Sequence, residues 1–384
     1  MKYYATIKIK QIVNIIVFAT VLTLLLVFSK QNYSSVQNSV TLFFSSVLPS
    51  LFPFIFFTEF ILHTNTIDNL SHYIGSFLSR LFHCDKRATP AIIIGFLCGF
   101  PMGAKTIAHL YEKGNISKAQ ATKLLLFINN CNPAFILSTI GISVFGNIKV
   151  GIILLISHYL SAILVGIAMG TKRFSSIILK NDKNLNTFVK TFQKEEKKDE
   201  TSFFENVKQS MMHAFLSLTN IFGFIIIFNL IFNILQTLLQ KLAVCPTFIA
   251  ILSGIFEITN GSSTIYQSSM SLPLKIETVS FVLGLSGICI LCQIYSTVSA
   301  HHFSFGKIAF AKTIQGIFSF GITYILLGII PIQDSTLPIF SNRDTTITYS
   351  DFIHQISHYY IDSVLLIIAF LCIYQFISLM KQKK

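Results

Sequence analysis

Charged side chains are scarce in this sequence. They make up 12% of its 384 residues, while hydrophobic residues make up 52% and the mean hydropathy is +0.66. A soluble domain carries about 25% charged residues, so this composition argues against a soluble enzyme. Tryptophan is absent, and the 38 phenylalanines supply apolar bulk suited to contact with lipid. The composition therefore predicts a polytopic membrane protein that has the lipid bilayer as a partner.

Acidic residues are few as well. There are 16 of them against 29 basic residues, which gives a net charge of +13 and a pI of about 9.4. Such a balance is common among nucleic-acid-binding proteins. Here the basic residues lie between long apolar runs, so they fit the loops of a membrane protein better. We expect no nucleic-acid partner.

Catalytic and metal-binding motifs are also missing. No P-loop, nucleophile elbow or metalloprotease motif occurs, which argues against an ATP-driven pump and against an enzyme. Cys289 and Cys292 have the spacing of a zinc or redox pair, but they lie in an apolar run without a second pair, which favours packing. The histidines form no metal-spaced set with carboxylates, so His158 and the others are expected at interfaces or in packing. We expect no catalytic residue, no metal and no cofactor.

Ten apolar segments run along the chain. Residues 1–39 are predicted to hold an uncleaved first span, because basic residues precede the apolar run and no small-residue cleavage site follows it. Residues 171–210 are rich in charge of both signs and are predicted to be a cytoplasmic linker. The apolar segments cover about residues 12–28, 40–62, 90–109, 122–146, 150–170, 211–240, 246–267, 278–300, 308–331 and 361–380.

Two of these segments are interrupted near their middle. Segment 90–109 is broken at Gly99–Gly103, where Pro101 cannot donate a hydrogen bond to the preceding turn. Segment 246–267 begins with a proline and is broken between Gly254 and Gly261. Two half-length helices joined by a break predict a re-entrant hairpin, which enters and leaves the membrane on the same face.

The distribution of charge favours one topology. If both hairpins are re-entrant, the other eight segments cross the membrane and both termini lie in the cytoplasm. The inner side then receives 24 of the 29 basic residues, Lys307 and Lys312 among them, as the positive-inside rule expects. The basic residues left outside are Lys30, Lys149, Lys241, Lys275 and Arg343.

The order of segments repeats within the chain. Residues 40–170 give a crossing, a hairpin, a broken crossing and a crossing, and residues 211–331 give the same order in the opposite orientation. An outer loop and a last span occupy residues 332–384. Inverted repeats with discontinuous helices are the architecture of secondary transporters, whose site lies where the breaks meet. We therefore predict an all-α polytopic membrane protein with about eight transmembrane helices and two re-entrant hairpins.

Polar residues gather at the breaks of the first half. A half-helix starting near Gly103 would point free N–H groups into the break, and Lys105 adds a full charge there, which suits a carboxylate or phosphate. The alternative is a lysine that extends to the inner face of the membrane. The next crossing is interrupted by three amides before a proline, which supply donors and acceptors where backbone pairing fails: Asn129, Asn130 and Asn132.

The second half supplies a carboxylate. Glu59 and Glu257 are acidic residues inside apolar segments, where a carboxylate costs on the order of 3 kcal/mol. Because Glu257 lies in the predicted hairpin break, we favour a functional role for it over a structural one. Glu59 lies near the end of its span, where a functional and a structural role are equally consistent with the sequence. Thr259 and Asn260 follow Glu257, although Asn260 also fits a simple turn. The corresponding broken crossing runs from Ser286 to Gln293.

Five motifs and a glutamine near position 293 resemble one known family. This family comprises the YlbJ sporulation integral membrane proteins, also called stage V sporulation protein V, in the nucleoside-recognition or Gate-domain superfamily. The resemblance covers about residues 40–325. The motifs are Leu51-Phe52-Pro53-Phe54, Gly95-Phe96-x-x-Gly99-Phe100-Pro101-Met102-Gly103-Ala104-Lys105, Asn129-Asn130-x-x-Pro133-x-Phe135, Gly254-Ile255-Phe256-Glu257-Ile258-Thr259-x-Gly261 and Gly284-Leu285-Ser286-Gly287.

The resemblance implies a role in endospore formation. It implies export of dipicolinic acid from the mother cell across the outer forespore membrane, so the protein is expected in a bacterial cell membrane. Dipicolinate is a small, flat dianion whose carboxylates suit Lys105, a half-helix N-terminus and amide donors. Glu257 would meet an anion only when protonated, so it is expected to couple protons or to pair with Lys105 in the empty site.

The expected substrate-binding set joins both breaks. The first hypothesis is a secondary transporter of a small aromatic dicarboxylate. The second is a transporter of nucleosides or similar neutral heterocycles, and the third is a spore-envelope assembly protein that transports nothing. The candidate residues are Gly99, Pro101, Gly103, Lys105, Asn129, Asn130, Asn132, Glu257, Thr259, Asn260 and Gln293.

Overall fold

The computed structural model describes residues 19, 22–63, 66–170, 203–330 and 332. Every regular element in these ranges is a helix, and none of the residues described there forms a strand. The predicted all-α class is confirmed. Most of segment 12–28, most of the linker 171–210 and the whole of segment 361–380 lie outside the described residues.

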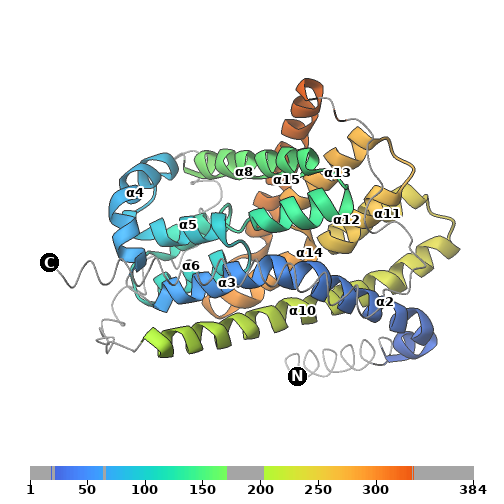
Figure 1. Ribbon diagram of the computed structural model, residues 1–384, viewed down its shortest axis with the longest axis horizontal. Helices are drawn as coiled ribbons and strands as arrows, with labels where there is room; N and C mark the ends of the chain where they lie inside the picture. The colour runs from blue at the N-terminus through green and yellow to red at the C-terminus, as the bar shows by residue number, and fades with distance from the viewer. Residues whose placement is uncertain (1–18, 20–21, 64–65, 171–202, 331, 333–384) are drawn as a thin grey trace, which may run out of the picture.

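The first half contains long helices interrupted by short ones (Figure 1). Its elements are α2 (Ser29–Leu42), the π-helical turn η1 (Phe43–Val47), α3 (Leu48–His63), α4 (Thr66–Phe82), the 3-10 turn η2 (Lys86–Ala88), α5 (Thr89–Leu97), α6 (Met102–Glu112), α7 (Lys118–Leu125), the π-helix η3 (Phe135–Val144) and α8 (Ile148–Gly170).

The second half also combines long and short helices, without an equivalent of α4 among its described residues. Its elements are α10 (Phe203–Lys241), α11 (Pro246–Phe256), α12 (Ile258–Gln267), α13 (Leu272–Leu285), α14 (Gly287–Val298), the 3-10 turn η4 (Ser299–His301) and α15 (Phe305–Ile329).

Five stretches of helix are long and apolar enough to cross a membrane, among the described residues. Each coincides with one of the eight predicted crossings. A sixth predicted crossing, 122–146, is divided into two short helices, and the other two are the first and last spans. The stretches are Ser29–Leu62, Ile148–Met169, Phe203–Lys241, Leu272–His301 and Phe305–Ile329.

Two helix starts lie earlier in the chain than predicted. The helical stretch expected from residue 40 begins with α2 at Ser29, because the polar side chains there find partners: Asn229 of α10 donates to the Ser39 hydroxyl at 2.9 Å. α10 begins at Phe203, inside the predicted linker, and the Phe203 ring packs edge-on against Phe60 with centroids 5.8 Å apart. Both helices thus make contacts with other helices outside their apolar runs, although only Asn32 and Ser39 of α2 are buried.

Both interrupted segments fold into pairs of short helices packed side by side. α5 and α6 are joined by the break Cys98–Pro101, and a Cβ on Gly103 would lie 3.0 Å from Gly95 Cα. α11 and α12 are joined by Glu257, and a Cβ on Gly261 would lie 2.2 Å from Gly254 Cα. Glycines eight residues apart in the first pair and seven apart in the second therefore let the two backbones of each pair touch.

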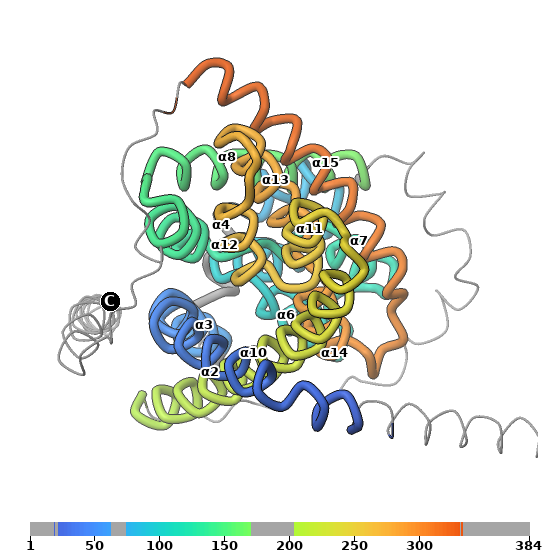
Figure 2. The backbone as a smooth tube through the Cα atoms, turned by 90° about the vertical axis from the view of Figure 1, so that its right-hand side faces the viewer, coloured from blue at the N-terminus to red at the C-terminus, as the bar shows by residue number. Residues whose placement is uncertain are grey.

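Helices of each half contact helices of the other half. α3 of the first half packs against α10 of the second, and α8 of the first half packs against α15 of the second. α12 contacts η3 of the first half, while α6 contacts α14 of the second. Figure 1 shows the α5–α6 pair towards the left and the α11–α12 pair towards the right, with α3 and α10 below them and α8 above. The view in Figure 2 again places α3 beside α10 and α8 beside α15.

Small and hydroxyl-bearing residues hold α8, α13 and α15 together. Gly284 of α13 lies against Gly316 of α15, since a Cβ on Gly284 would meet Gly316 Cα at 2.7 Å. Thr323 of α15 lies 2.8 Å from the Ser157 hydroxyl of α8 and 2.7 Å from the Ser280 hydroxyl of α13. All three hydroxyl side chains are buried, so these bonds satisfy groups that lipid cannot.

Candidate functional site

A small cavity lies where the interrupted elements of both halves meet. Its volume is about 20 Å³, enough for one or two water molecules. It is mostly apolar, and its polar wall consists of Asn132, Glu257, Thr259 and Gln293. The full lining is Val47, Leu51, Phe100, Asn132, Phe135, Ile221, Ile225, Glu257, Ile258, Thr259, Cys289, Ile290 and Gln293.

The break of the first hairpin is bonded to the break of the next helix. Phe100 donates its backbone N–H to the Asn130 carbonyl at 3.0 Å, and Asn132 Nδ2 lies 3.5 Å from the Cys98 carbonyl. Gly99 has φ +81°, a conformation that glycine adopts without strain, and a Cβ there would lie 2.9 Å from Asn132 N. Gly99 thus serves close backbone approach, and it brings Phe100 and Asn132 to the cavity wall.

Glu257 caps the second half-helix from within the cavity wall. Its Oε1 accepts from the Thr259 backbone N–H and its Oε2 from the Asn260 backbone N–H, both at 2.8 Å. The residue is 3% exposed, and its extended backbone separates α11 from α12. A carboxylate at a helix N-terminus satisfies free N–H groups and the positive end of the helix dipole. The N-terminus of α12 is therefore occupied by the protein's own carboxylate, whereas the anion-binding position predicted near Gly103 belongs to the other half-helix, α6.

Gln293 leaves one acceptor without a partner beside the cavity. Its Nε2 lies 3.3 Å from Cys289 Sγ, whereas its buried Oε1 has no hydrogen bond. Gln293 is 4% exposed and belongs to α14, which follows the break at Ser286. A buried acceptor without a donor costs about 1–3 kcal/mol, so Gln293 is suited to a ligand that supplies the missing bond.

Lys105 lies in an ion pair away from the cavity. Its Nζ is 2.5 Å from Glu59 Oε1, with the Lys105 side chain 37% exposed and the Glu59 side chain 3% exposed. The expectation that Lys105 pairs with Glu257 in the empty site is wrong, because Glu257 is already bonded to α12. Glu59, which the sequence left undecided between a functional and a structural role, is the partner that neutralises Lys105 between α3 and α6.

Lys312 was assigned to the inner face, and the structure places it in the interior instead. Its side chain is fully buried and donates to the Asn129 carbonyl, to Gln315 Oε1 at 2.8 Å and to Asn130 Oδ1 at 3.4 Å. Gln315 Nε2 also donates to Asn130 Oδ1 at 3.0 Å. Asn129 and Asn130 are thus committed to this cluster behind the cavity. The Lys-x-x-Gln spacing on one helix face was the only sequence signal for it.

His158 fastens α8 to the broken helix. Its Nε2 accepts the Cys131 backbone N–H at 3.0 Å, and the adjacent Tyr159 hydroxyl donates to the carbonyls of Phe96 at 2.6 Å and Cys131 at 2.9 Å. The expected packing role of His158 fits its complete burial. No group of three His, Cys, Asp or Glu residues suited to a metal occurs within the described ranges.

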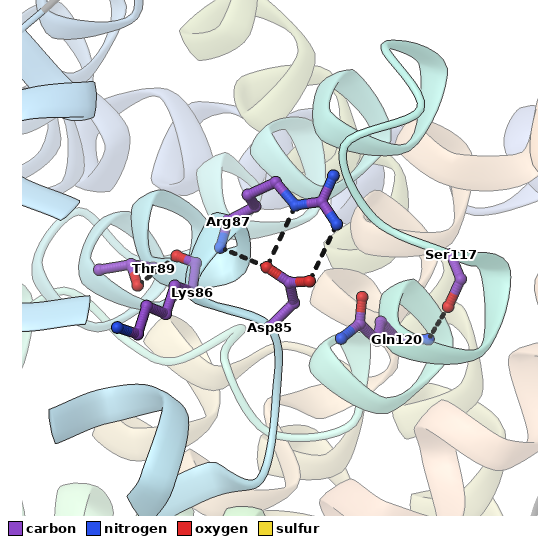
Figure 3. A network of polar contacts seen from close by, with 6 residues as sticks. All are labelled: Asp85, Lys86, Arg87, Thr89, Ser117 and Gln120. Carbon is purple, nitrogen blue, oxygen red and sulfur yellow. Dashed lines mark hydrogen bonds and ion pairs between the residues drawn. The ribbon is translucent and has the colours of Figure 1, made fainter. Parts of the chain in front are cut away.

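A charged cluster precedes the first hairpin (Figure 3). Asp85 accepts from the Arg87 side chain at 3.0 and 3.2 Å and from its backbone N–H at 2.9 Å, and these bonds lower the pKa of Asp85. Lys123 donates to the carbonyls of Phe82 at 2.7 Å and His83 at 2.8 Å, at the end of α4. None of these residues lines the cavity, so the cluster stabilises the loop that leads into α5.

The structure brings together part of the predicted binding set. Asn132, Glu257, Thr259 and Gln293 line the cavity, while the Asn260 backbone joins them through Glu257. The remaining six lie behind the cavity or in helix packing, with Pro101 preceding α6 and Gly103 against Gly95. These six are Gly99, Pro101, Gly103, Lys105, Asn129 and Asn130.

Known proteins support the motif resemblance. A family model described as Gate, nucleoside recognition, matches residues 44–179, which include the first hairpin, the broken helix and α8. The sporulation integral membrane protein YlbJ of Bacillus subtilis (strain 168) is 26% identical over 312 residues, covering 75% of this chain and 76% of that protein. The resemblance to the YlbJ family is confirmed. No solved structure matches the chain.

The Gate match covers only part of the cavity wall. Of the polar cavity wall, the Gate match contains Asn132, whereas Glu257, Thr259 and Gln293 come from the second half of the chain. Sporulation and an integral membrane position are the two properties in the YlbJ relative's name. The apolar helices and this relative together make the chain an integral membrane protein. Neither description is that of a known enzyme family.

Proposed function

We propose that the protein is a secondary transporter that binds its solute in the cavity between the two interrupted halves. The observation that carries this proposal is the meeting of both hairpins and both broken helices at one cavity with a buried polar wall. Discontinuous helices meeting at the centre of two repeats are the usual site of a secondary transporter. The proposed architecture has eight crossings, two re-entrant hairpins and inverted repeats, with both termini in the cytoplasm.

The proposed substrate is a small aromatic dicarboxylate, dipicolinate first of all. The amide groups of Asn132 and Gln293 and the N-terminus of α12 are donors for its carboxylates, provided that Glu257 is protonated or moves. The cavity is too small for such a molecule, so the two halves must rock apart to admit it. Lys105 would reach the solute only after leaving Glu59 in the opened state.

A neutral heterocycle such as a nucleoside is the second candidate. It is favoured by the acceptors of the polar wall, namely the unpartnered Gln293 Oε1 and the carboxylate of Glu257. A ligand with N–H or O–H donors would satisfy both without requiring a protonated carboxyl. The matched family description, nucleoside recognition, points the same way.

Uptake into proteoliposomes tests these candidates directly. We expect the purified protein to accumulate labelled dipicolinate, with excess unlabelled dipicolinate competing and nucleosides not competing. The reverse competition would assign the site to nucleosides. Lys105→Ala is expected to slow dipicolinate uptake, and full activity of this variant would remove Lys105 from the site. Absence of any uptake, together with normal dipicolinate content in spores lacking the protein, would favour a spore-envelope assembly role.

Cysteine labelling tests the inverted topology. Cys245, at the start of α11, is exposed, and hydrogen bonds from the backbone N–H groups of Phe248 and Thr247 lower the pKa of its thiol, which favours reaction with maleimide. In a variant that keeps only Cys245, a membrane-impermeant maleimide should label intact bacterial cells. In a variant whose only cysteine is Lys86→Cys, it should label inside-out vesicles instead. Labelling of both positions from the same side would refute the inverted arrangement.

The proposed location is the outer forespore membrane of a sporulating cell. Export from the mother cell towards the spore requires the cytoplasmic side of the protein to face the mother cell. The sporulation relative supports the process, and the membrane-spanning helices support an integral position. A fluorescent fusion seen at the engulfing membrane before the spore fills with dipicolinate would support this placement, and a fusion confined to the inner forespore membrane would reject it.

A further inference from the structure

Lys312 is a buried cation without a carboxylate. It lies in the first third of α15 and is fully buried, with none of its side chain exposed to solvent. None of the ion pairs formed within the described residues includes it. An uncompensated charge in a membrane interior is costly, so its surroundings must stabilise it by hydrogen bonds.

Oxygen atoms supply that stabilisation. The three acceptors of the Lys312 ammonium are the Asn129 carbonyl, Gln315 Oε1 at 2.8 Å and Asn130 Oδ1 at 3.4 Å. An ammonium has three donors, so each proton has an acceptor. Gln315 Nε2 also donates to Asn130 Oδ1 at 3.0 Å, which fixes both amides with their oxygens towards Lys312. We call these three oxygens, from Asn129, Asn130 and Gln315, the oxygen cage. Neutral oxygens of this kind are the ligands that bind a monovalent cation in a membrane protein.

The cage lies at the broken helix rather than along a regular one. α7 ends at Leu125, and Asn129 and Asn130 lie in the irregular stretch before η3. In secondary transporters, carbonyl groups of unwound helix segments bind the coupling cation. Here the position is filled by a side chain that reaches across from α15 of the other half.

The same stretch connects Lys312 to the cavity. The Asn130 carbonyl accepts the backbone N–H of Phe100 at 3.0 Å, and Phe100 lines the cavity together with Asn132. Binding of the Lys312 ammonium in the cage therefore holds the backbone around Asn130, which forms one wall of the proposed solute site. Removing the charge would leave the Asn129 carbonyl and Gln315 Oε1 without the ammonium donor, while Gln315 Nε2 would still donate to Asn130 Oδ1.

We propose that the Lys312 ammonium occupies a built-in monovalent-cation site at the broken helix, so that the protein transports its solute without a bound sodium or potassium ion. The cation site itself is argued from geometry alone, whereas its consequence for sodium and potassium rests on the proposed transport function and is the subject of the first test. The second test measures cation binding in the purified protein and requires no transport.

The first test compares wild-type uptake in different salts. Proteoliposomes are prepared with sodium, potassium or choline as the only monovalent cation, at equal ionic strength and with a pH gradient of the same sign. We expect equal initial rates of dipicolinate uptake in the three salts. A requirement for sodium or potassium would overturn the proposal, whereas no uptake in any salt would count against the proposed function and leave the second test to decide the cation site.

The second test removes the Lys312 ammonium from the oxygen cage by mutation. Lys312→Ala should lower the thermal midpoint of the purified protein, and methylammonium or ethylammonium should raise it again in proportion to concentration, because either cation fits among the freed oxygens. The matched control is Lys307→Ala, which removes a half-buried lysine from the same helix. Its midpoint should not respond to these cations. Choline, which lacks N–H donors, should rescue neither variant.

One further variant and one change of purification conditions keep the proposal testable if Lys312→Ala does not fold. Lys312→Met retains the length of the side chain without the charge, and purification with ethylammonium present should restore the yield of Lys312→Ala. If transport is active, emptying the cage should reduce uptake by roughly 5- to 150-fold, the usual range of coupling between two sites, with partial recovery in ethylammonium. Full stability and uptake of Lys312→Met without any added cation would overturn the proposal.

Discussion

Glu257→Gln is expected to remove the dependence of uptake on pH. In the wild-type protein a dianion can approach the α12 N-terminus only when the Glu257 carboxyl is neutral, since the ionised carboxylate already takes the N–H groups of Thr259 and Asn260. Uptake should therefore rise as the pH falls on the substrate side. The glutamine is neutral at every pH, so the variant should transport at a rate that stays flat across the same range. Initial rates from pH 5 to 8 measure the difference.

Substitution of Glu257 by alanine distinguishes its proposed role in proton coupling from its role as the N-terminal cap of α12. Glu257→Ala leaves two buried N–H groups without acceptors, at about 1–3 kcal/mol each, so this variant should lose stability as well as transport. Glu205→Gln is the matched control, because Glu205 lies near the start of α10 with its side chain 44% exposed. It should keep the wild-type pH profile. Unchanged pH dependence in Glu257→Gln would show that Glu257 does not couple protons.

Gly261→Ala is expected to disrupt the second hairpin. A Cβ at this position would lie 2.2 Å from Gly254 Cα and 2.4 Å from Gly254 N, so the clash is with backbone that cannot rotate away. Inserting atoms into a closely packed interior costs about 1–3 kcal/mol, and more where backbone must move. We expect a loss at or above the upper end of that range, measured as a lower thermal midpoint and a reduced yield of monodisperse protein in detergent.

Gly321→Ala provides the control for this substitution. Gly321 lies within α15, and a Cβ built there meets no atom within 4 Å. Alanine should stabilise the helix there by up to about 1 kcal/mol, because glycine is the poorer helix former. Equal midpoints for Gly261→Ala and Gly321→Ala would mean that α11 and α12 do not pack as closely as described.

The main features of the fold could be predicted from apolar length and from glycine and proline positions. Apolar length reflects the thickness of the bilayer, and glycine and proline mark where a helix is interrupted. The interruptions predicted at Pro101, at Glu257 and at Ser286 all correspond to observed breaks. Ser286 has φ +70° and ends α13, with Gly287 at φ +63° beside it. Helix starts were less accurate, because the polar stretch from Ser29 is held by contacts with α10 that no local pattern encodes.

The site was predicted less completely, for a physical reason. Sequence position showed that Lys105 and Glu257 lie at breaks, but the partner of each charge depends on packing between helices distant in the chain. Lys105 meets Glu59, 46 residues earlier, and Lys312 meets Asn129, 183 residues earlier. A lysine near the start of a span looks the same whether it extends to water or turns inward. For this reason the sequence places Lys312 among the basic residues on the inner side of the membrane, whereas its side chain lies in the protein interior.

The reciprocal contacts between the halves also bear on how such a protein avoids leaking ions. α12 packs against η3 and α6 packs against α14, so each hairpin rests on the interrupted helix of the other half. In the transport cycle proposed above, displacing one hairpin would therefore also shift the interrupted helix of the other half. Opening both sides at once would separate both interfaces together and forfeit the burial of each. If the protein transports a solute as proposed, these shared interfaces would disfavour a continuous water path, and the cell would keep its ion gradients during transport.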